Sequence, residues 1–314
     1  MPLTAEQKQY YYDVIARTGA LRNSFQSRVI PEWYTAYLDK VTQEEVRVPT
    51  DYGDVRVIVT TAKEKAANCP MHINMHGGGF YFPQNRDDDM YCAHLAAEIH
   101  GVVVDIDYAL SQDQPFPAAF GQCYAVCGWA FEHAAAWGCD ANRVSIGGHS
   151  AGGNLTAAIT IRAGQTGDYR FCLQVVDFAA LNMQKSQQSP KGENANPDAL
   201  VISSERSDAF FSLYTDGNDA LCTSPFVSPL FADDEMLALT PPAALVISAG
   251  TCGFRFENED YGMRLVKLGK EVTMRRFVNS RHGFTVRLVD EWAEAQQLII
   301  DVINMTPALP AKEA

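Results

Sequence analysis

The first group in the sequence with the means to do chemistry is a serine in a glycine-rich turn, GGHSAGG at residues 147–153. The apolar run RVSI precedes the turn and the helix-forming run NLTAAITIRA follows it, so Ser150 lies at a predicted strand-to-helix turn. Gly148 and Gly152 remove side chains that would collide there, which allows Ser150 a strained backbone. The pattern predicts a nucleophilic serine, and the alternative is a glycine-rich turn with an incidental serine.

A second glycine-rich stretch, HGGGF at residues 76–80, follows the strand-like run MHINM. Consecutive glycines let backbone N–H groups approach a substrate oxygen without obstruction by side chains. We expect the amides of Gly77, Gly78 and Ala151 to form an oxyanion hole. His76 is interpreted as a hydrogen-bonded structural histidine. HGGG alone is a weak signal, and the later GHSAGG strengthens it.

A general base for this serine is predicted in SRHGF, residues 280–284, just beyond the strand-like run VTMRRFV. His282 is the only histidine after Ser150, and in this chain order the base follows the nucleophile. The alternative is that His282 is a satisfied structural histidine. His149, next to the serine, is expected to support the turn rather than to take protons.

Seven short apolar runs are typical of buried strands: VRVIVTT, MHINMH, VVVDIDY, RVSIGG, LQVVDF, AALVISAG and VTMRRFV. Helical stretches such as CYAVCGWAFEHAAAW and NLTAAITIRAGQ lie between the later runs. This alternation predicts an α/β fold with a mostly parallel sheet that helices cover on both faces.

Two segments stand outside this alternation. Residues 4–40 carry helical periodicity that begins with Thr4 and Gln7, the pattern of a capping box. Residues 183–224 start rich in Pro, Gly and Asn and turn helical around SDAFFSLY, and an insertion of this length is usually functional. We predict one compact unit with 1–45 as the N-terminal helical part of a cap, 46–182 and 225–314 as the core, and 183–224 as a cap or lid insertion.

Together these motifs resemble the hormone-sensitive-lipase-like esterases among the α/β-hydrolases. DYALSQDQPFPAA is similar to the family's DYRLAPEHPFPAA, and CDANRVSIGGHSAGGNL is similar to its D-x-x-R-V-x-I-G-D-S-A-G-G-N-L block. SPFVSPLFADD, PPAALVISAG and HGF complete the order. The resemblance implies an α/β-hydrolase fold with a helical cap, and ester hydrolysis that needs neither cofactor nor metal.

The acid of the expected catalytic triad is missing from its usual place. In ISAGTCGFRFENED, residues 247–260, a gapless match to the family's S/T-A-G-x-D-x-L-x-D-E puts Cys252 where the carboxylate belongs. Asp177 in LQVVDF replaces an apolar residue of the family pattern, and pancreatic-lipase-like hydrolases carry their acid on a similar strand. Glu257, which matches a supporting glutamate of the family, and a Ser–His dyad without an acid are the alternatives. We favour Asp177.

Composition narrows the classes of partner. The chain has 314 residues, a net charge of −13 and no long apolar run, so we expect neither nucleic acid nor a membrane as a partner. The N-terminus does not resemble a secretory signal, and a cytoplasmic location is expected. Eight scattered cysteines predict buried free thiols, without metal-ligand spacing. The oligomeric state stays open, a homodimer included.

The sequence therefore predicts a carboxylesterase-type serine hydrolase. It would cleave esters of small acyl or aromatic substrates through an acyl-enzyme on Ser150, with His282 as the base. The same machinery could serve an amidase, a formamidase or a sugar-acetate deacetylase. An alternative of another class is a non-catalytic ligand-binding protein on a decayed hydrolase scaffold, as in the plant gibberellin receptors that resemble this family.

Overall fold

The centre of the protein is an eight-stranded sheet with the strand order β1-β2-β4-β3-β5-β6-β7-β8. The computed structural model describes residues 2–18, 30–184 and 204–311. Strand β2 is antiparallel to both of its neighbours, and every pair from β4 to β8 is parallel. The strands are β1 (Val41–Val48), β2 (Val55–Ala62), β3 (Cys69–Met75), β4 (Val102–Asp107), β5 (Cys139–His149), β6 (Leu173–Asp177), β7 (Ala243–Ala249) and β8 (Glu271–Phe277).

All seven strands predicted from the sequence are present, and the prediction of a mostly parallel sheet is confirmed. Strand β1 was missed. Its sequence VTQEEVRV is polar, and only its two end residues are buried, because it forms the outer strand of a hairpin with β2. Since β1 begins at Val41, the sheet starts before the predicted core boundary at residue 46.

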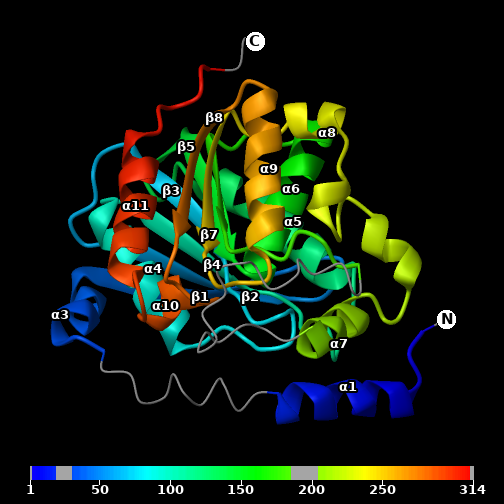
Figure 1. The fold of residues 1–314 in the computed structure, drawn as a ribbon. Helices are drawn as coiled ribbons and strands as arrows, with labels where there is room; N and C mark the ends of the chain where they lie inside the picture. The colour runs from blue at the N-terminus through cyan, green and yellow to red at the C-terminus, as the bar shows by residue number, and fades with distance from the viewer. Residues whose placement is uncertain (1, 19–29, 185–203, 312–314) are drawn as a thin grey trace.

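Helices cover both faces of the sheet (Figure 1). Helices α4 and α11 lie on one face, and α5, α6 and α9 lie on the other. Every residue of β3, β6 and β7 is buried between these layers, as expected for parallel strands at the centre of an α/β fold. The main helices of the core are α4 (Arg86–Glu98), α5 (Ala118–His133), α6 (Ala151–Thr166), α8 (Asp234–Ala238), α9 (Arg255–Lys267), α10 (Phe284–Arg287) and α11 (Trp292–Met305).

The N-terminal helix α1 (Ala5–Arg17) packs against α7 (Ser204–Tyr214), at the lower end of the molecule in Figure 1. The predicted capping box of α1 is confirmed: Thr4 N–H donates to the Gln7 side chain at 2.8 Å, and Gln7 N–H donates to Thr4 Oγ1 at 3.2 Å. Arg206 of α7 donates to the carbonyl of Ile15 at 2.7 Å, which joins the two helices.

The predicted cap is described only in part. Residues 19–29 and 185–203 lie outside the described residues, so parts of the N-terminal segment and of the 183–224 insertion are not described. The remaining short helices are α3 (Glu32–Thr35), η1 (Ala36–Lys40), η2 (Asp219–Thr223) and η3 (Pro229–Phe231).

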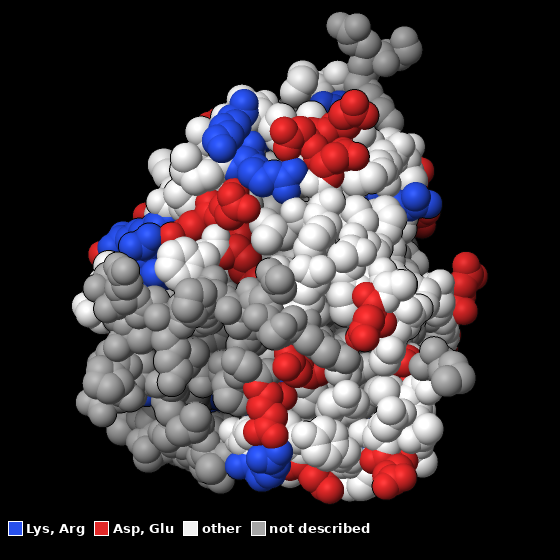
Figure 2. All heavy atoms as spheres, turned by 45° about the vertical axis from the view of Figure 1, so that its right-hand side comes forward, with Lys and Arg blue, Asp and Glu red and all other residues white. Residues whose placement is uncertain are grey.

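Charge is spread unevenly over the surface. Figure 2 shows several separate groups of acidic side chains on one face, and the Lys and Arg side chains that are described there make no continuous basic stripe. Among the helices of the described chain, none has the length and apolar character that a membrane crossing requires.

Candidate active site

Ser150 occupies a strained turn between β5 and α6. Its backbone has φ 58° and ψ −115°, a conformation that residues other than glycine rarely adopt. Such strain is typical of functional turns. A Cβ atom at Gly152 would lie 1.9 Å from the carbonyl oxygen of Met75, and one at Gly148 would lie 2.6 Å from the same oxygen. The two glycines therefore let the turn pass directly against β3, as the sequence predicted.

His282 lies beside Ser150, although 132 positions separate them in the chain. The distance from His282 Nε2 to Ser150 Oγ is 2.9 Å, which is a hydrogen bond between the predicted base and the predicted nucleophile. The imidazole ring packs edge-on against Phe178 and Phe254, with centroid distances of 4.9 and 5.3 Å. These contacts fix the plane of the ring.

The other ring nitrogen of His282 faces a thiol. Cys252 Sγ lies 3.1 Å from His282 Nδ1, and the backbone N–H of Phe254 donates to the same sulfur at 3.4 Å. The loop after β7 reaches this place because Thr251 bonds the carbonyl of Ser280 twice, through N–H at 3.2 Å and through Oγ1 at 2.8 Å. The gapless match was therefore right about where Cys252 lies.

The structure corrects the assignment of Asp177 as the partner of His282. Nδ1 of the ring is engaged by Cys252, and no hydrogen bond joins Asp177 to His282 in the described chain. Asp177 acts here through its backbone, since its carbonyl accepts the N–H of Ser150 at 2.9 Å. Its side chain is buried, which raises the pKa of the carboxyl well above its usual range, and Thr285 opposes this rise only in part. A raised pKa disfavours the charged carboxylate that a triad requires.

Glu257, the alternative acid, bonds the backbone of the loop after β6. Its Oε1 accepts the backbone N–H of Leu181 at 3.0 Å. Burial raises the pKa of Glu257 well above its usual range, and hydrogen bonds from the backbone of Leu181 and Asn182 oppose this rise. Its neighbour Asn258 exchanges hydrogen bonds of 2.9 and 2.7 Å with the backbone of Ala179. This part of α9 therefore holds the loop that follows β6.

Burial sets the electrostatics of the site. Removal from water lowers the pKa of His282 to about 3, and the positive charge of Arg287 adds to this. Burial raises the pKa of Cys252 to about 12, against the hydrogen bond from Phe254. At neutral pH the site therefore holds a neutral imidazole and a neutral thiol, and the position opposite Nδ1 lacks a fixed negative charge.

The predicted oxyanion loop lies against the serine turn. A Cβ atom at Gly77 would be 3.0 Å from the carbonyl oxygen of His149 and 3.5 Å from Ser150 Cβ, so only glycine allows this approach without displacement. Gly78 follows with φ +130°. Within the described residues, the N–H groups of Gly77, Gly78 and Ala151 donate no hydrogen bond, which leaves them available to a substrate oxygen.

Two supporting histidines flank this loop. His76 is fully buried, stacks on Tyr108 at 4.1 Å and bonds the carbonyl of Gly77 at 2.8 Å, as expected for a structural histidine. His149 Nε2 lies 3.2 Å from Asp88 Oδ1, and both side chains are buried. Sequence reasoning missed Asp88. The capping box of Asn85 and Asp88 at the start of α4 fixes the carboxylate in place, but this local pattern does not signal the contact with His149.

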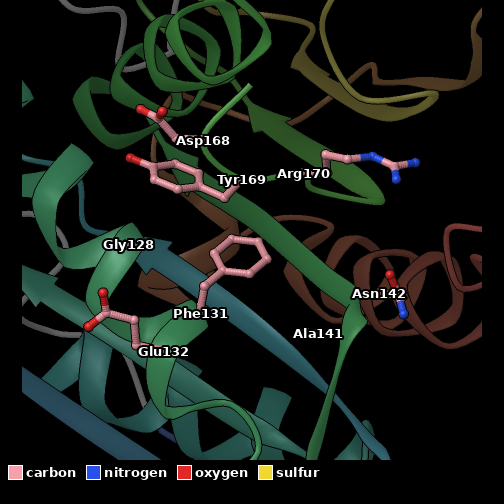
Figure 3. Close-up of a pocket in the computed structure, with 8 residues that line it drawn as sticks. All are labelled: Gly128, Phe131, Glu132, Ala141, Asn142, Asp168, Tyr169 and Arg170. Atoms are coloured by element: carbon pink, nitrogen blue, oxygen red, sulfur yellow. The ribbon is translucent and has the colours of Figure 1, made fainter. Parts of the chain in front are cut away.

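A hollow of about 470 Å³ lies elsewhere on the described surface (Figure 3). The rings of Phe131 and Tyr169 stack beside it with centroids 5.4 Å apart. Ala141 and Asn142 belong to the start of β5, whereas Ser150 follows the end of that strand. The hollow is therefore at the opposite edge of the sheet from the serine. In the described chain no group of three or more His, Cys, Asp or Glu residues could hold a metal ion.

Comparison with known proteins places this geometry in context. A family model described as alpha/beta hydrolase fold matches residues 72–286. Esterase LipI of Mycobacterium tuberculosis is 30% identical over 219 residues, which are 69% of this chain and 66% of LipI. Human hormone-sensitive lipase is 36% identical over 95 residues, which are 30% of this chain and 9% of that protein. The chain thus matches slightly less than two thirds of LipI.

Solved structures of esterases share this fold over more of the chain. The hyperthermophilic esterase from the archaeon Pyrobaculum calidifontis is 27% identical and superposes with a TM-score of 0.79. The alignment covers 97% of this chain and 98% of that one.

Proposed function

The chain belongs to the hormone-sensitive-lipase-like α/β-hydrolases, and from this membership and its site geometry we propose that it is a carboxylesterase-type serine hydrolase acting on small-molecule esters. The observation that carries the proposal is the hydrogen bond of 2.9 Å between His282 Nε2 and Ser150 Oγ at a strained strand-to-helix turn. A serine hydroxyl becomes a nucleophile when an adjacent base takes its proton.

In the first step Ser150 Oγ attacks the ester carbonyl and His282 Nε2 takes its proton. Nε2 must be free of a proton beforehand, so the ring proton is on Nδ1. This N–H donates a hydrogen bond to Cys252 Sγ. The sulfur already accepts the N–H of Phe254, which supports its role as an acceptor. His282 then gives its proton to the leaving alcohol, and water releases the acid from Ser150 with the same histidine as base.

The oxygen that becomes negative during attack is assigned to the N–H groups of Gly77, Gly78 and Ala151. Gly77 lies against the serine turn, and Ala151 N–H lies at the N-terminus of α6, where the helix dipole favours negative charge. Donors that are already oriented stabilise such a charge without rearrangement.

Cys252 orients His282 without supplying charge. An orienting carboxylate both holds the tautomer and stabilises the imidazolium that forms during attack. A neutral thiol performs the first task through a weak hydrogen bond and does not perform the second. We therefore propose an active enzyme whose turnover is limited by the missing charge.

Aromatic side chains support small acyl or aromatic esters as the substrate class. Phe210 of α7 lies against Gly79 of the oxyanion loop, close enough that a Cβ at Gly79 would meet its ring at 2.7 Å. Tyr81 and Phe82 lie within 6.1 Å of Phe210, centroid to centroid. Helix α7 thus brings an apolar wall to the loop that would hold the ester carbonyl, consistent with a role as a cap.

The missing carboxylate also favours a second candidate, a ligand-binding protein that retains the hydrolase scaffold without catalysis. A fluorophosphonate probe separates the two. The esterase proposal expects stoichiometric labelling of Ser150, found by peptide mapping, together with hydrolysis of p-nitrophenyl acetate and butyrate. A panel of anilides tests amide cleavage in the same assay. Ser150→Ala serves as the control for both readouts, and an unlabelled Ser150 in folded protein would overturn the esterase proposal.

A further inference from the structure

Two cysteines face each other at the edge of the sheet opposite the serine. Cys69 is the first residue of β3 and Cys139 is the first residue of β5. The two strands are parallel neighbours, and these residues are partners in their register. Their sulfur atoms lie 3.3 Å apart.

This geometry suits a disulfide. Neighbouring strands lie about 4.8 Å apart, which is within the Cα separation of about 4.4–6.8 Å that disulfides span. The sulfur atoms need to approach by only about 1.2 Å to reach a bond length of about 2.05 Å. The regular register of β3 with β5 shifts between Cys69 and Met71, and a local contact holds the two cysteines together, because Cys69 N–H donates to the carbonyl of Gly138 at 3.3 Å.

The surroundings make one of the two thiols the nucleophile. The hydrogen bond with the Cys139 thiol lowers the pKa of Cys69, against its own burial, and the ammonium of Lys65 lowers it further. The same contact raises the pKa of Cys139, which keeps its proton. Cys69 is fully buried and Cys139 is 7% exposed, so an oxidant small enough to pass beside Cys139 is needed to reach the pair. A thiolate beside a protonated thiol is the arrangement in which oxidation to a disulfide begins.

We propose that Cys69 and Cys139 form a reversible redox pair that hydrogen peroxide, or a small disulfide such as oxidised glutathione, converts to an intramolecular disulfide. With peroxide, the Cys69 thiolate attacks one oxygen, the O–O bond breaks, and a sulfenic acid and water form. Cys139 then attacks the Cys69 sulfur and displaces the second oxygen as water. The two thiols lose two protons and two electrons, and these convert one peroxide to two waters.

The disulfide would fasten the two strands that carry the site. Strand β3 leads into the Gly77–Gly78 loop, and β5 leads into Ser150. The bond joins residues 70 positions apart in the chain, and closing a long loop restricts the unfolded chain strongly. Because the bond forms at the far end of both strands, it stabilises the scaffold and leaves the reacting groups untouched. The proposal does not depend on the proposed esterase activity.

The test starts from the full-length protein, reduced with dithiothreitol, desalted, and exposed to a graded series of peroxide or of glutathione redox buffers. Remaining thiols are alkylated in denaturant, and the mass and peptide map are recorded. We expect loss of two thiols, a decrease of about 2 Da before alkylation and a cross-linked peptide pair that contains Cys69 and Cys139. Dithiothreitol should reverse all three changes. The oxidised form should melt about 5 °C higher than the reduced form.

Variants define the site. Cys69→Ala and Cys139→Ala should each abolish both the cross-link and the shift in melting temperature. Cys172→Ala is the matched control, because Cys172 is a buried thiol just before β6, at the same edge of the sheet, and should behave as the parent. Peptide mapping of the parent needs no variant and decides the outcome if a variant does not fold. Cross-links between other cysteines, glutathione adducts alone, or eight intact thiols at every oxidant level would overturn the proposal.

Discussion

Cys252 Sγ lies 3.1 Å from Nδ1 of His282, in the place where a triad of this chain order carries a carboxylate. The sulfur also accepts the N–H of Phe254, a hydrogen bond that a carboxylate oxygen at this position could accept. The geometry of a triad is therefore complete, and its charge is absent. The consequences of this combination can be measured.

Restoring the carboxylate should accelerate the enzyme. Loss of the orienting carboxylate costs about 10⁴-fold in a related triad, so we expect Cys252→Asp to raise kcat for p-nitrophenyl esters about 10-fold or more. Cys252→Asn is the matched control, because it has the same shape without the charge and should bring no gain. Steady-state kinetics at pH 8 decide the matter, and equal kcat in the Asp and Asn variants would show that charge opposite Nδ1 is not limiting.

The dependence of kcat/KM on pH should also reflect the missing negative charge beside His282 Nδ1. The base acts only when neutral, and burial lowers the pKa of His282 to about 3, so activity falls only as the pH drops toward that value. We expect the acidic limb of kcat/KM to lie below about pH 5 in the parent. In Cys252→Asp a neighbouring negative charge favours the imidazolium and moves the limb upward. A parent limb near the ordinary histidine value of about 6.5 would contradict this.

The sequence located the reacting pair and the vacancy because both depend on short motifs in fixed order. Ser150 and His282 follow the ends of recognisable strands, and the position of Cys252 follows from a gapless match. Asp177 was misassigned because a sequence shows that a carboxylate lies at a strand end, but it does not show which neighbours surround the side chain. The side chain of Asp177 makes no hydrogen bond with the imidazole in the described chain, and its burial raises the pKa of the carboxyl.

Two further features escaped the sequence for related reasons. Strand β1 lacks the apolar character by which buried strands are recognised, since its stability comes from pairing with β2. The contact of Asp88 with His149 joins the first turn of α4 to the serine turn 61 positions away. Acidic residues in a first helical turn are usually explained by the helix dipole, and only the tertiary fold reveals the second partner.

Asp177→Asn should leave catalysis nearly intact and change the pH dependence of stability. We expect kcat within about threefold of the parent, because the side chain does not contact His282. The pKa of Asp177 is raised in the folded state, so the unfolded chain releases its proton first and the parent loses stability as pH rises above about 4. The Asn variant lacks this loss. Urea unfolding at pH 5 and pH 8 should show the variant gaining stability relative to the parent at the higher pH, and a kcat lowered by orders of magnitude would reinstate Asp177 as the triad acid.

Asp88 should support both stability and catalysis through its contact with His149. The two side chains are buried and 3.2 Å apart, and His149 immediately precedes the nucleophile in the chain. Removing one partner of a buried hydrogen bond costs about 1–3 kcal/mol, so we expect Asp88→Ala to lower the melting temperature by several degrees and to reduce kcat by about 10-fold as the serine turn loosens. Asp87→Ala, one residue earlier in the same turn and partly exposed, is the control and should have a small effect on both. Calorimetry and esterase kinetics on the two variants separate the roles. Equal effects would mean that the acidic turn acts on α4 as a whole, whereas a drop confined to Asp88→Ala would assign the support of Ser150 to this one carboxylate.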